Sequence, residues 1–280
     1  MEKSLKKYFP VFVLPTLIAF TIAFIVPFIL GIFLSFTEFT TVTDAKWVGI
    51  KNYIRIFEDG DFLNALWFTV RFALVSVISI NVFAFLLALL LTRGLKGTNL
   101  FRTIFFMPNL IGGIVLGYIW ILILNGLLAH WGVTITYDPK YGFWGLVILM
   151  NWQLIGYMMI IYIAGIQSVP DSLIEAAKID GATPGRILRS ITIPMVMPSI
   201  TICMFLTVSN AFKLFDQNLA LTAGAPSNKT AMMALDIYTT FYGRVGWEGV
   251  GQAKAVLFFI IVAIISLPQV LTTRNKEVES

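Results

Sequence analysis

Six long apolar runs constrain this chain more strongly than any other feature of its sequence. A helix rises about 1.5 Å per residue and a hydrocarbon core is about 30 Å thick, so roughly 20 apolar residues can cross a bilayer. The runs cover Val11–Phe36, Asn64–Thr92, Ile104–Leu124, Phe143–Ile166, Met195–Phe215 and Gly251–Leu271. The sequence therefore predicts an all-α integral membrane protein with six transmembrane helices.

The composition excludes several other classes of protein. Hydrophobic residues make up 58% of the chain and charged residues only 12%, which is not the composition of a soluble globular domain. The net charge of +5 comes from basic residues scattered along the chain, so nucleic-acid binding is not indicated. With one cysteine, Cys203, and one histidine, His130, we expect no disulfide, no Cys/His metal site, no Ser/His/Asp triad and no cofactor.

The distribution of Lys and Arg between alternate sides predicts the orientation of the chain. Short cytoplasmic loops retain an excess of basic residues. One side carries Lys3, Lys6, Lys7, Arg93, Lys96, Arg102, Lys178, Arg186, Arg189, Arg274 and Lys276, and the other carries Lys46, Lys51, Arg55, Lys140, Lys229 and Arg244. The first side is predicted to be cytoplasmic, and an even number of spans places both termini there.

No low-complexity segment or long soluble insertion divides the chain. We expect residues 1–63 to form an N-terminal transmembrane helix and an outer loop, residues 64–272 the main transmembrane domain, and residues 273–280 a cytoplasmic tail. Proline removes a helix hydrogen bond and favours a bend, so bends are expected at Pro15, Pro27, Pro108, Pro198 and Pro268. The small residues Gly112, Gly113 and Gly117 would let another helix approach closely.

The polar stretch of residues 167–194 carries the signals of ordered helices rather than of a slack linker. Ser172 followed three residues later by Glu175 has the pattern of a capping box at a helix N-terminus. Gly181 is the residue best able to adopt the left-handed conformation that ends a helix. A first short helix is predicted between them.

A second short helix is predicted directly afterwards. Thr183 can cap its N-terminus, and Pro184 at the first helical position loses no hydrogen bond. We expect the helix to stop near Pro194. The two helices, bent at Gly181, would form a rigid cytoplasmic projection, which we call the elbow (residues 172–193).

The string EAAKIDGATPGRILRSITIPMVMP, from Glu175 to Pro198, resembles the EAA loop of permeases in bacterial binding-protein-dependent ATP-binding-cassette (ABC) importers. The stretches WVGIKNYIRIF and LTAGAP are similar to the carbohydrate-importer branch, and the resemblance covers nearly the whole chain. It implies the type I importer permease fold, with the elbow docked on a cytoplasmic ATPase. The docking residues that it implies are Glu175, Ala176, Ala177, Asp180 and Gly181.

Polar side chains within the predicted spans are candidates for a transport pathway, because polar groups at membrane depth face protein or water. The candidates are Asn151, Trp152, Gln153, Tyr157, Ser209, Asn210 and Lys213. The resemblance implies that aromatic rings and amides from these two helices hold a sugar between permease subunits. Interfacial anchoring and helix-to-helix hydrogen bonding remain alternatives for each residue. Asn81 is a candidate for a buried contact, and Arg71 could snorkel outward.

The favoured function is therefore a non-catalytic permease subunit of a sugar importer, with an oligosaccharide as the expected cargo. No G-x-x-x-x-G-K-[ST] phosphate loop occurs, so ATP hydrolysis is expected from a partner. The resemblance implies a second homologous permease, an ATPase dimer and an extracytoplasmic sugar-binding protein in a bacterial cell membrane. A secondary transporter coupled to an ion gradient is the alternative, although no Asp or Glu lies mid-span.

Overall fold

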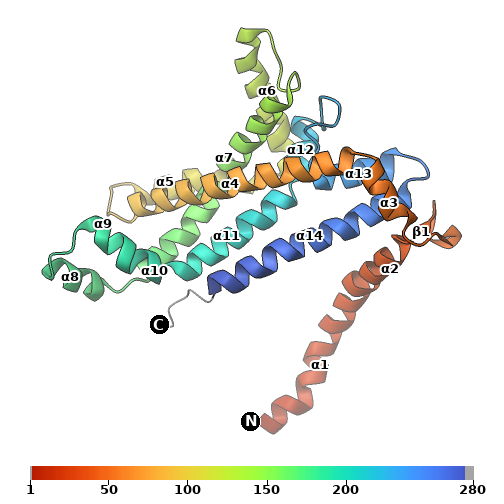
Figure 1. The fold of residues 1–280 in the computed structure, drawn as a ribbon. Coiled ribbons are helices and arrows are strands. Elements are labelled where there is room, and N and C mark those ends of the chain that lie inside the picture. Colours follow the sequence, from red (N-terminus) through yellow and green to blue (C-terminus); the bar gives the residue numbers. More distant parts are fainter. Residues whose placement is uncertain (1, 275–280) are drawn as a thin grey trace. The chain divides into compact units, whose positions relative to one another are not determined.

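The computed structural model describes residues 2–274, shown as a ribbon in Figure 1. The predicted tail residues 275–280, Lys276 included, lie outside the described residues, as do the side chains of residues 2–8. The described chain is mostly helical, and its strands are the two-residue β1 (Thr37–Glu38) and β2 (Lys46–Trp47), paired antiparallel. The all-α prediction is confirmed.

The chain divides into two compact units. The first contains the residues up to Phe62 together with Ile237–Phe259, and the second contains Leu63–Asp236 and the residues from Ile260 onward. Helices α4 (Asp61–Leu91), α13 (Met233–Gly243) and α14 (Glu248–Arg274) pass from one unit to the other. The three predicted domain ranges stay a prediction.

The first unit opens with a long apolar helix that contains a π-helical turn. Its remaining elements are α1 (Glu2–Phe20), η1 (Thr21–Ile25), α2 (Val26–Leu34), η2 (Val42–Asp44) and α3 (Lys51–Glu58), besides the two strands. Pro27 lies in the first turn of α2, directly after η1, so the irregular turn occurs where the missing amide was expected to disturb the helix. The side chain of Asp44 accepts hydrogen bonds from the amides of Thr40 and Thr41 and closes the turn between the strands.

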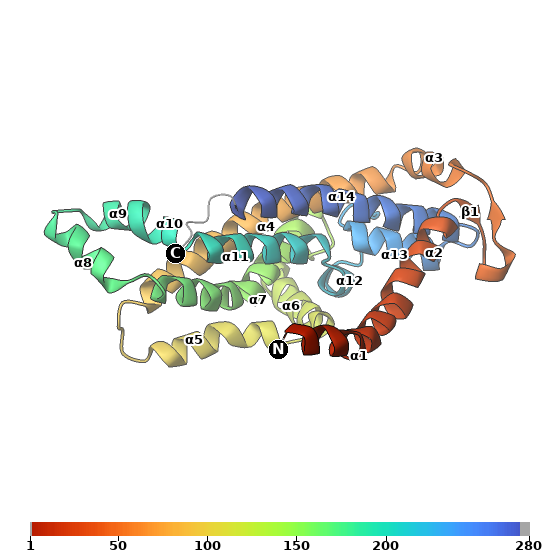
Figure 2. The ribbon, with the colours of Figure 1, turned by 90° about the horizontal axis from the view of Figure 1, so that it is seen from below.

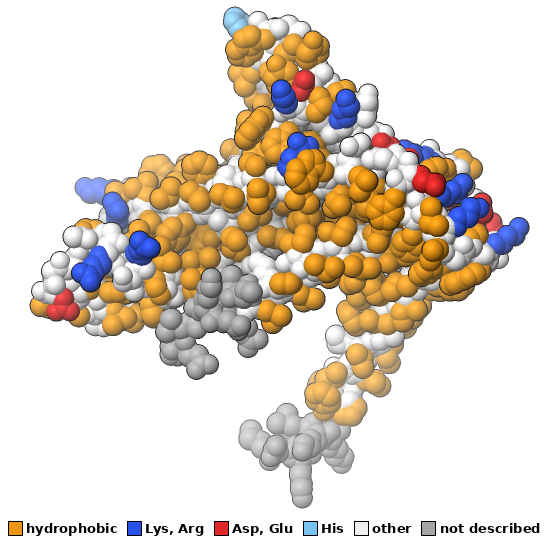
Figure 3. Space-filling model, viewed as in Figure 1, with side chains coloured by type: hydrophobic (Ala, Val, Ile, Leu, Met, Phe, Trp, Pro, Cys, Tyr) orange, Lys and Arg blue, Asp and Glu red, His pale blue; other side chains and the backbone are white. Residues whose placement is uncertain are grey.

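The second unit contains the elbow and most of the transmembrane helices. Its further elements are α5 (Thr98–Phe106), η3 (Met107–Leu110), α6 (Gly113–Leu128), η4 (Ala129–Trp131), α7 (Pro139–Gln167), α8 (Asp171–Ile179), α9 (Pro184–Ile187), η5 (Leu188–Thr192), α10 (Ile193–Met195), α11 (Met197–Phe212) and α12 (Asp216–Leu221). Along these helices the surface in Figure 3 is mostly hydrophobic, as lipid contact requires.

Five helices of the described residues are long and apolar enough to cross a membrane, and a bent pair makes a sixth span if it is counted as one. The five cover Phe9–Leu34, Asp61–Leu91, Gly113–Trp131, Pro139–Gln167 and Glu248–Gln269, and the pair joins Pro184–Met195 to Met197–Phe212. The predicted six spans agree with this count when the bent pair is taken as one span. Membrane lipid surrounds a protein of this kind.

The predicted start of the third span, at Ile104, is wrong. Ile104 lies in α5, a separate helix, and the span begins at Gly113. The helix breaks because Pro108 has no amide hydrogen to donate and Gly112 adopts an extended conformation (φ −61°, ψ 141°). The apolar run continues across this break, which hides it in the sequence.

A buried hydrogen-bond network joins three helices of the second unit. The Tyr162 hydroxyl of α7 donates to Asn81 Oδ1 of α4 at 2.6 Å, and Asn81 Nδ2 donates to Thr207 Oγ1 of α11 at 2.9 Å. All three side chains are buried. The expectation that Asn81 makes a buried contact is confirmed, and the network fixes how α4, α7 and α11 pack.

Small residues allow two further close approaches in this unit. A Cβ on Gly117 of α6 would lie 2.5 Å from the Ala220 Cβ of α12, and a Cβ on Gly113 would lie 2.8 Å from Asp216 Cβ. Gly112 has open space around it, so it plays no such role. On α7, a Cβ on Gly156 would lie only 1.8 Å from the Phe105 carbonyl oxygen of α5. Glycine at these positions is a packing requirement.

Candidate coupling elbow and transport pathway

The first elbow helix, α8, begins one residue before the predicted cap. Its N-cap is Pro170, no side chain caps the helix, and Ser172 lies inside its first turn. The predicted Ser172–Glu175 capping box is therefore wrong, because a capping box needs its serine at the N-cap and its glutamate three residues later. Glu175 is instead exposed, and capping does not occupy its carboxylate.

The end of α8 is the predicted left-handed stop at Gly181. Gly181 has φ 74°, its amide donates to the Lys178 carbonyl at 3.1 Å, and the Ala182 amide donates to the Ala177 carbonyl at 2.9 Å. These two bonds form a Schellman motif, which satisfies carbonyls that the helix end leaves free. A side chain at Gly181 would be strained by the positive φ although open space surrounds it.

The second elbow helix starts and ends close to its predicted positions. Thr183 Oγ1 accepts the Arg186 amide at 3.4 Å, and Pro184 occupies the first turn of α9. The predicted stop near Pro194 is confirmed: helical structure continues to Met195, and the chain then bends by 69° into α11. The Val196 amide still donates to the Thr192 carbonyl at 2.9 Å, so Pro194 interrupts no more than its own bond.

The elbow projects beyond the ends of α7 and α11, as both ribbon views show (Figures 1 and 2). Glu175, Ala176, Asp180 and Gly181 are exposed on it, and Ala177 is half-buried. Ile179 is 86% exposed, and the charged residues Lys178 and Asp180 flank it. Ile179 was not among the predicted docking residues, although its apolar character within the polar stretch was a usable signal.

On α7 the four pathway candidates have different surroundings. Trp152 is 45% exposed and its ring lies edge-on to Trp120 of α6, with the centroids 5.7 Å apart. Tyr157 is half-buried against Phe106. The other two candidates are amides, and they differ in whether their polar atoms are satisfied.

Gln153 is buried, and its side-chain oxygen and nitrogen both make hydrogen bonds. Its Oε1 accepts Gln217 Nε2 of α12 at 2.8 Å, and its Nε2 donates to the Ile111 carbonyl at 3.4 Å. Gln153 therefore ties α7 to α12, a role that was left open as the alternative. Asn151 donates to the Val147 carbonyl at 2.8 Å, but its Oδ1 is buried and, among the described residues, has no hydrogen-bond partner.

The α11 candidates lie near the C-terminal end of that helix. Asn210 is exposed and donates to the Leu206 carbonyl of its own helix at 2.8 Å. Ser209 is half-buried, and Lys213 is exposed at the position that ends α11. Asn210 and Lys213 are thus accessible for contact with another molecule.

Trp152 also lines a groove of about 490 Å³. The rest of its lining is apolar, from Phe83, Leu87, Ile104, Phe105, Met107, Pro108, Ile111, Ile155 and Gly156. Such a groove offers a flat aromatic face but few partners for hydroxyl groups. Hydrogen bonds to a polar cargo would have to come from other side chains or from a neighbouring subunit.

The sequence profile of the family described as binding-protein-dependent transport system inner membrane component matches residues 80–274, which include α7, the elbow and α11. The chain belongs to this family. It is therefore a membrane component of a transport system, and the expected family is confirmed.

Individual relatives match over almost the whole chain. It is 45% identical to the probable starch degradation products transport system permease protein of Thermoanaerobacterium thermosulfurigenes, over 96% of this chain and 94% of that protein. It is 32% identical to the multiple sugar-binding transport system permease protein of Streptococcus mutans, over 99% of both chains.

The fold of this family member also matches solved importers. A chain in the crystal structure of a bacterial ABC transporter for the acidic polysaccharide alginate superposes with a TM-score of 0.82, at 22% identity and 98% coverage of each chain. At that identity the match shows the fold alone. The predicted type I importer permease fold with its elbow is confirmed.

Proposed function

We propose that this chain is the permease subunit of an ABC importer for a sugar, with an oligosaccharide as its cargo. The observation that carries the proposal is the exposed elbow, whose chemistry is that of a docking surface. Relatives at 45% and 32% identity are named as permeases for starch degradation products and for multiple sugars, which supports the sugar class.

The proposed partners follow from what the chain lacks and from what it presents. It has no phosphate loop, so a cytoplasmic ATPase dimer would supply the energy and the chain itself would not be an enzyme. Glu175, Ala176, Ala177, Asp180 and Gly181 would seat the elbow on that ATPase. A second, homologous permease would complete the pathway, and an extracytoplasmic binding protein would deliver the sugar.

Movement of the elbow would then drive alternating access. α7 ends at Gln167, directly before the elbow, and the 69° bend at Val196 joins the elbow to α11. A rigid displacement of the elbow would therefore act on the two helices that carry the pathway candidates. Both termini and the elbow would lie on the cytoplasmic side of a bacterial cell membrane.

Within the pathway, Trp152 would offer its exposed face to the apolar face of a sugar ring. Asn151, whose Oδ1 lacks a partner among the described residues, would bind a hydroxyl group or the second permease. Tyr157, Ser209, Asn210 and Lys213 would add polar contacts. Gln153 would contribute indirectly, by holding α7 against α12.

Transport by the assembled system tests this proposal. The chain would be reconstituted in liposomes with a candidate permease partner, the ATPase and the binding protein, and uptake of a labelled maltooligosaccharide would be measured. We expect uptake with ATP and without any ion gradient, and none with an ATPase variant that lacks its phosphate-loop lysine. Uptake that ignores ATP but follows a sodium or proton gradient would establish the secondary-transporter alternative instead.

A further inference from the structure

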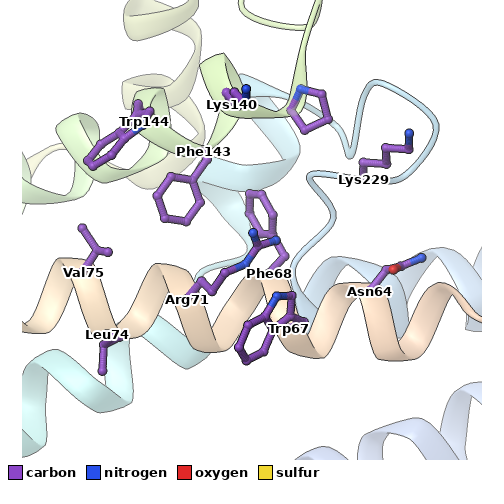
Figure 4. Close-up of a pocket in the computed structure, with 11 residues that line it drawn as sticks. Asn64, Trp67, Phe68, Arg71, Leu74, Val75, Lys140, Phe143, Trp144 and Lys229 are labelled. Atoms are coloured by element: carbon purple, nitrogen blue, oxygen red, sulfur yellow. The ribbon is translucent and has the colours of Figure 1, made fainter.

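A second cavity lies on the second unit, at the end of α4 and α7 that is far from the elbow. It has a volume of about 480 Å³, and Figure 4 shows the side chains that line it. α7 starts in this cavity at Pro139 and reaches the elbow side at Gln167, about 42 Å away along the helix. The cavity therefore opens at the membrane face opposite the elbow.

Three cationic side chains line this cavity and no carboxylate does. They are Arg71 of α4, Lys140 in the first turn of α7, and Lys229 in the segment between α12 and α13. Among the described residues none of the three has a carboxylate within 4 Å, because every ion pair there involves Arg244 or Lys254. The neighbouring Asp138 uses its Oδ1 to cap α7 through the Lys140 amide.

Arg71 is the cation whose place within a membrane-spanning helix most requires a partner. It lies ten residues after Asp61, about 15 Å along α4, within a helix long and apolar enough to span the membrane. Its side chain is exposed and its guanidinium carbon lies 5.6 Å from the centre of the Trp67 ring. A guanidinium facing lipid at this depth is costly unless an anion or water reaches it.

The surroundings of the cations are apolar and exposed. Trp67, Leu74 and Trp144 are 60%, 64% and 54% exposed, and Figure 4 shows the Arg71 side chain rising from α4 beside the Phe68 ring. Leu74 lies one turn beyond Arg71, further from the start of α4 and deeper in the span. A ligand that neutralises the cations and covers the apolar side chains needs an anionic head near the helix ends and an apolar tail that runs along α4.

We propose that this cavity binds the phosphate headgroup of an anionic phospholipid from the leaflet opposite the elbow. Arg71, Lys140 and Lys229 neutralise the headgroup, while Trp67, Leu74 and Trp144 pack against the glycerol backbone and the upper acyl chains. Basic pockets between transmembrane helices recognise anionic lipid heads in this manner. A small soluble anion would leave the exposed apolar ring around the cations uncovered.

Native mass spectrometry of the full chain, purified with its transport partners, tests this lipid site. Phosphatidylglycerol and phosphatidylcholine would be titrated onto the wild type, onto R71Q/K140Q/K229Q, and onto K46Q/K51Q/R93Q. The last variant is a matched control, since it removes three exposed cations elsewhere. We expect the cavity variant to bind phosphatidylglycerol at least about tenfold more weakly, the control to match the wild type, and phosphatidylcholine to bind weakly to all three.

Several results would overturn the lipid assignment. They are equal phosphatidylglycerol binding by both triple variants, equal binding of the two lipids to the wild type, displacement of the lipid by millimolar inorganic phosphate, and binding to the isolated chain but not to the complex. If the cavity triple variant does not fold, Arg71→Lys and Arg71→Gln replace it. Arg71→Lys should then retain phosphatidylglycerol and Arg71→Gln should lose it several-fold, and equal retention by the two would refute the site.

Discussion

The ion-pair cluster of the first unit predicts that two aspartates on one arginine contribute very differently to stability. Arg244 contacts Asp59 at 2.7 Å and Asp61 at 2.6 Å. Asp59 has a side chain only 11% exposed and also contacts Lys254, which is completely buried, at 3.2 Å. The Asp61 side chain is 27% exposed, and among the described residues its ion-pair partner is Arg244.

The expected costs follow from burial and from the number of bonds lost. Asp59→Ala removes a hydrogen bond from two cations at once, and bonds to charged groups contribute about 1.5–3 kcal/mol each when buried. We expect a loss of about 3 kcal/mol for Asp59→Ala. Asp61→Ala removes a single ion pair, which is more exposed to solvent, and should cost about 1 kcal/mol or less.

Thermal unfolding of the purified full chain in detergent measures this difference. A protein of 150–250 residues loses about 2–4 °C in Tm per kcal/mol, so Asp59→Ala should lower Tm by roughly 6–12 °C and Asp61→Ala by about 4 °C or less. Equal shifts for the two variants would show that burial and the second contact to Lys254 do not matter, and would refute the reasoning.

The same cluster predicts a pH dependence. Burial raises the pKa of Asp59, but its hydrogen bonds to Arg244 and Lys254 and their positive charges outweigh burial and hold the pKa below the ordinary value of 3.8. Asp59 therefore stabilises the folded chain above that ordinary value, and the stabilisation is lost as the pH falls through the lower folded value. The Tm difference between the wild type and Asp59→Ala should persist at pH 5–8 and shrink below pH 4; a constant difference would contradict this.

Three further substitutions test the packing of the second unit and the elbow. Asn81→Leu removes the hydrogen bonds that join α4 to α7 and α11, and it should lower the stability by about 1–2 kcal/mol, measured as a lower Tm. An unchanged Tm would show that the network does not stabilise the fold. Gly156→Ala should reduce the folded yield, because its Cβ would overlap the Phe105 carbonyl, whereas Gly126→Ala, with open space around it, should not. Gly181→Val should weaken co-purification with the ATPase while the chain stays in the membrane.

Most of the fold could be predicted from the sequence, because a chain that crosses lipid must satisfy its backbone hydrogen bonds internally and few folds do so. Helix length, apolar composition and the glycine stop at Gly181 each act locally, so they could be predicted without knowledge of the packing. The break before Gly113 was predicted only as a bend at Pro108, because the apolar run continues on both sides and hides the separate helix α5. The bend at Val196 lies between the predicted helix end near Pro194 and the bend expected at Pro198.

The candidate site was only partly predictable. The elbow could be located from its polar character, but the capping role of Ser172 was wrong because the helix starts earlier, at Asp171. Which polar side chains project and which join helices depends on the rotation of each helix. Gln153 and Trp152 are adjacent in sequence, yet one is buried against Gln217 and the other is exposed.

The most direct test of the central claim, that the elbow docks the ATPase, is co-purification with substitutions of exposed apolar residues. Ile179 is 86% exposed on the elbow, and Val245, between α13 and α14, is 93% exposed. Neither side chain is needed for packing, so Ile179→Asp and Val245→Asp should both leave the chain folded. We predict that Ile179→Asp loses most of the bound ATPase and that Val245→Asp retains it. Retention of the ATPase by Ile179→Asp, or equal loss by both variants, would contradict docking through the elbow.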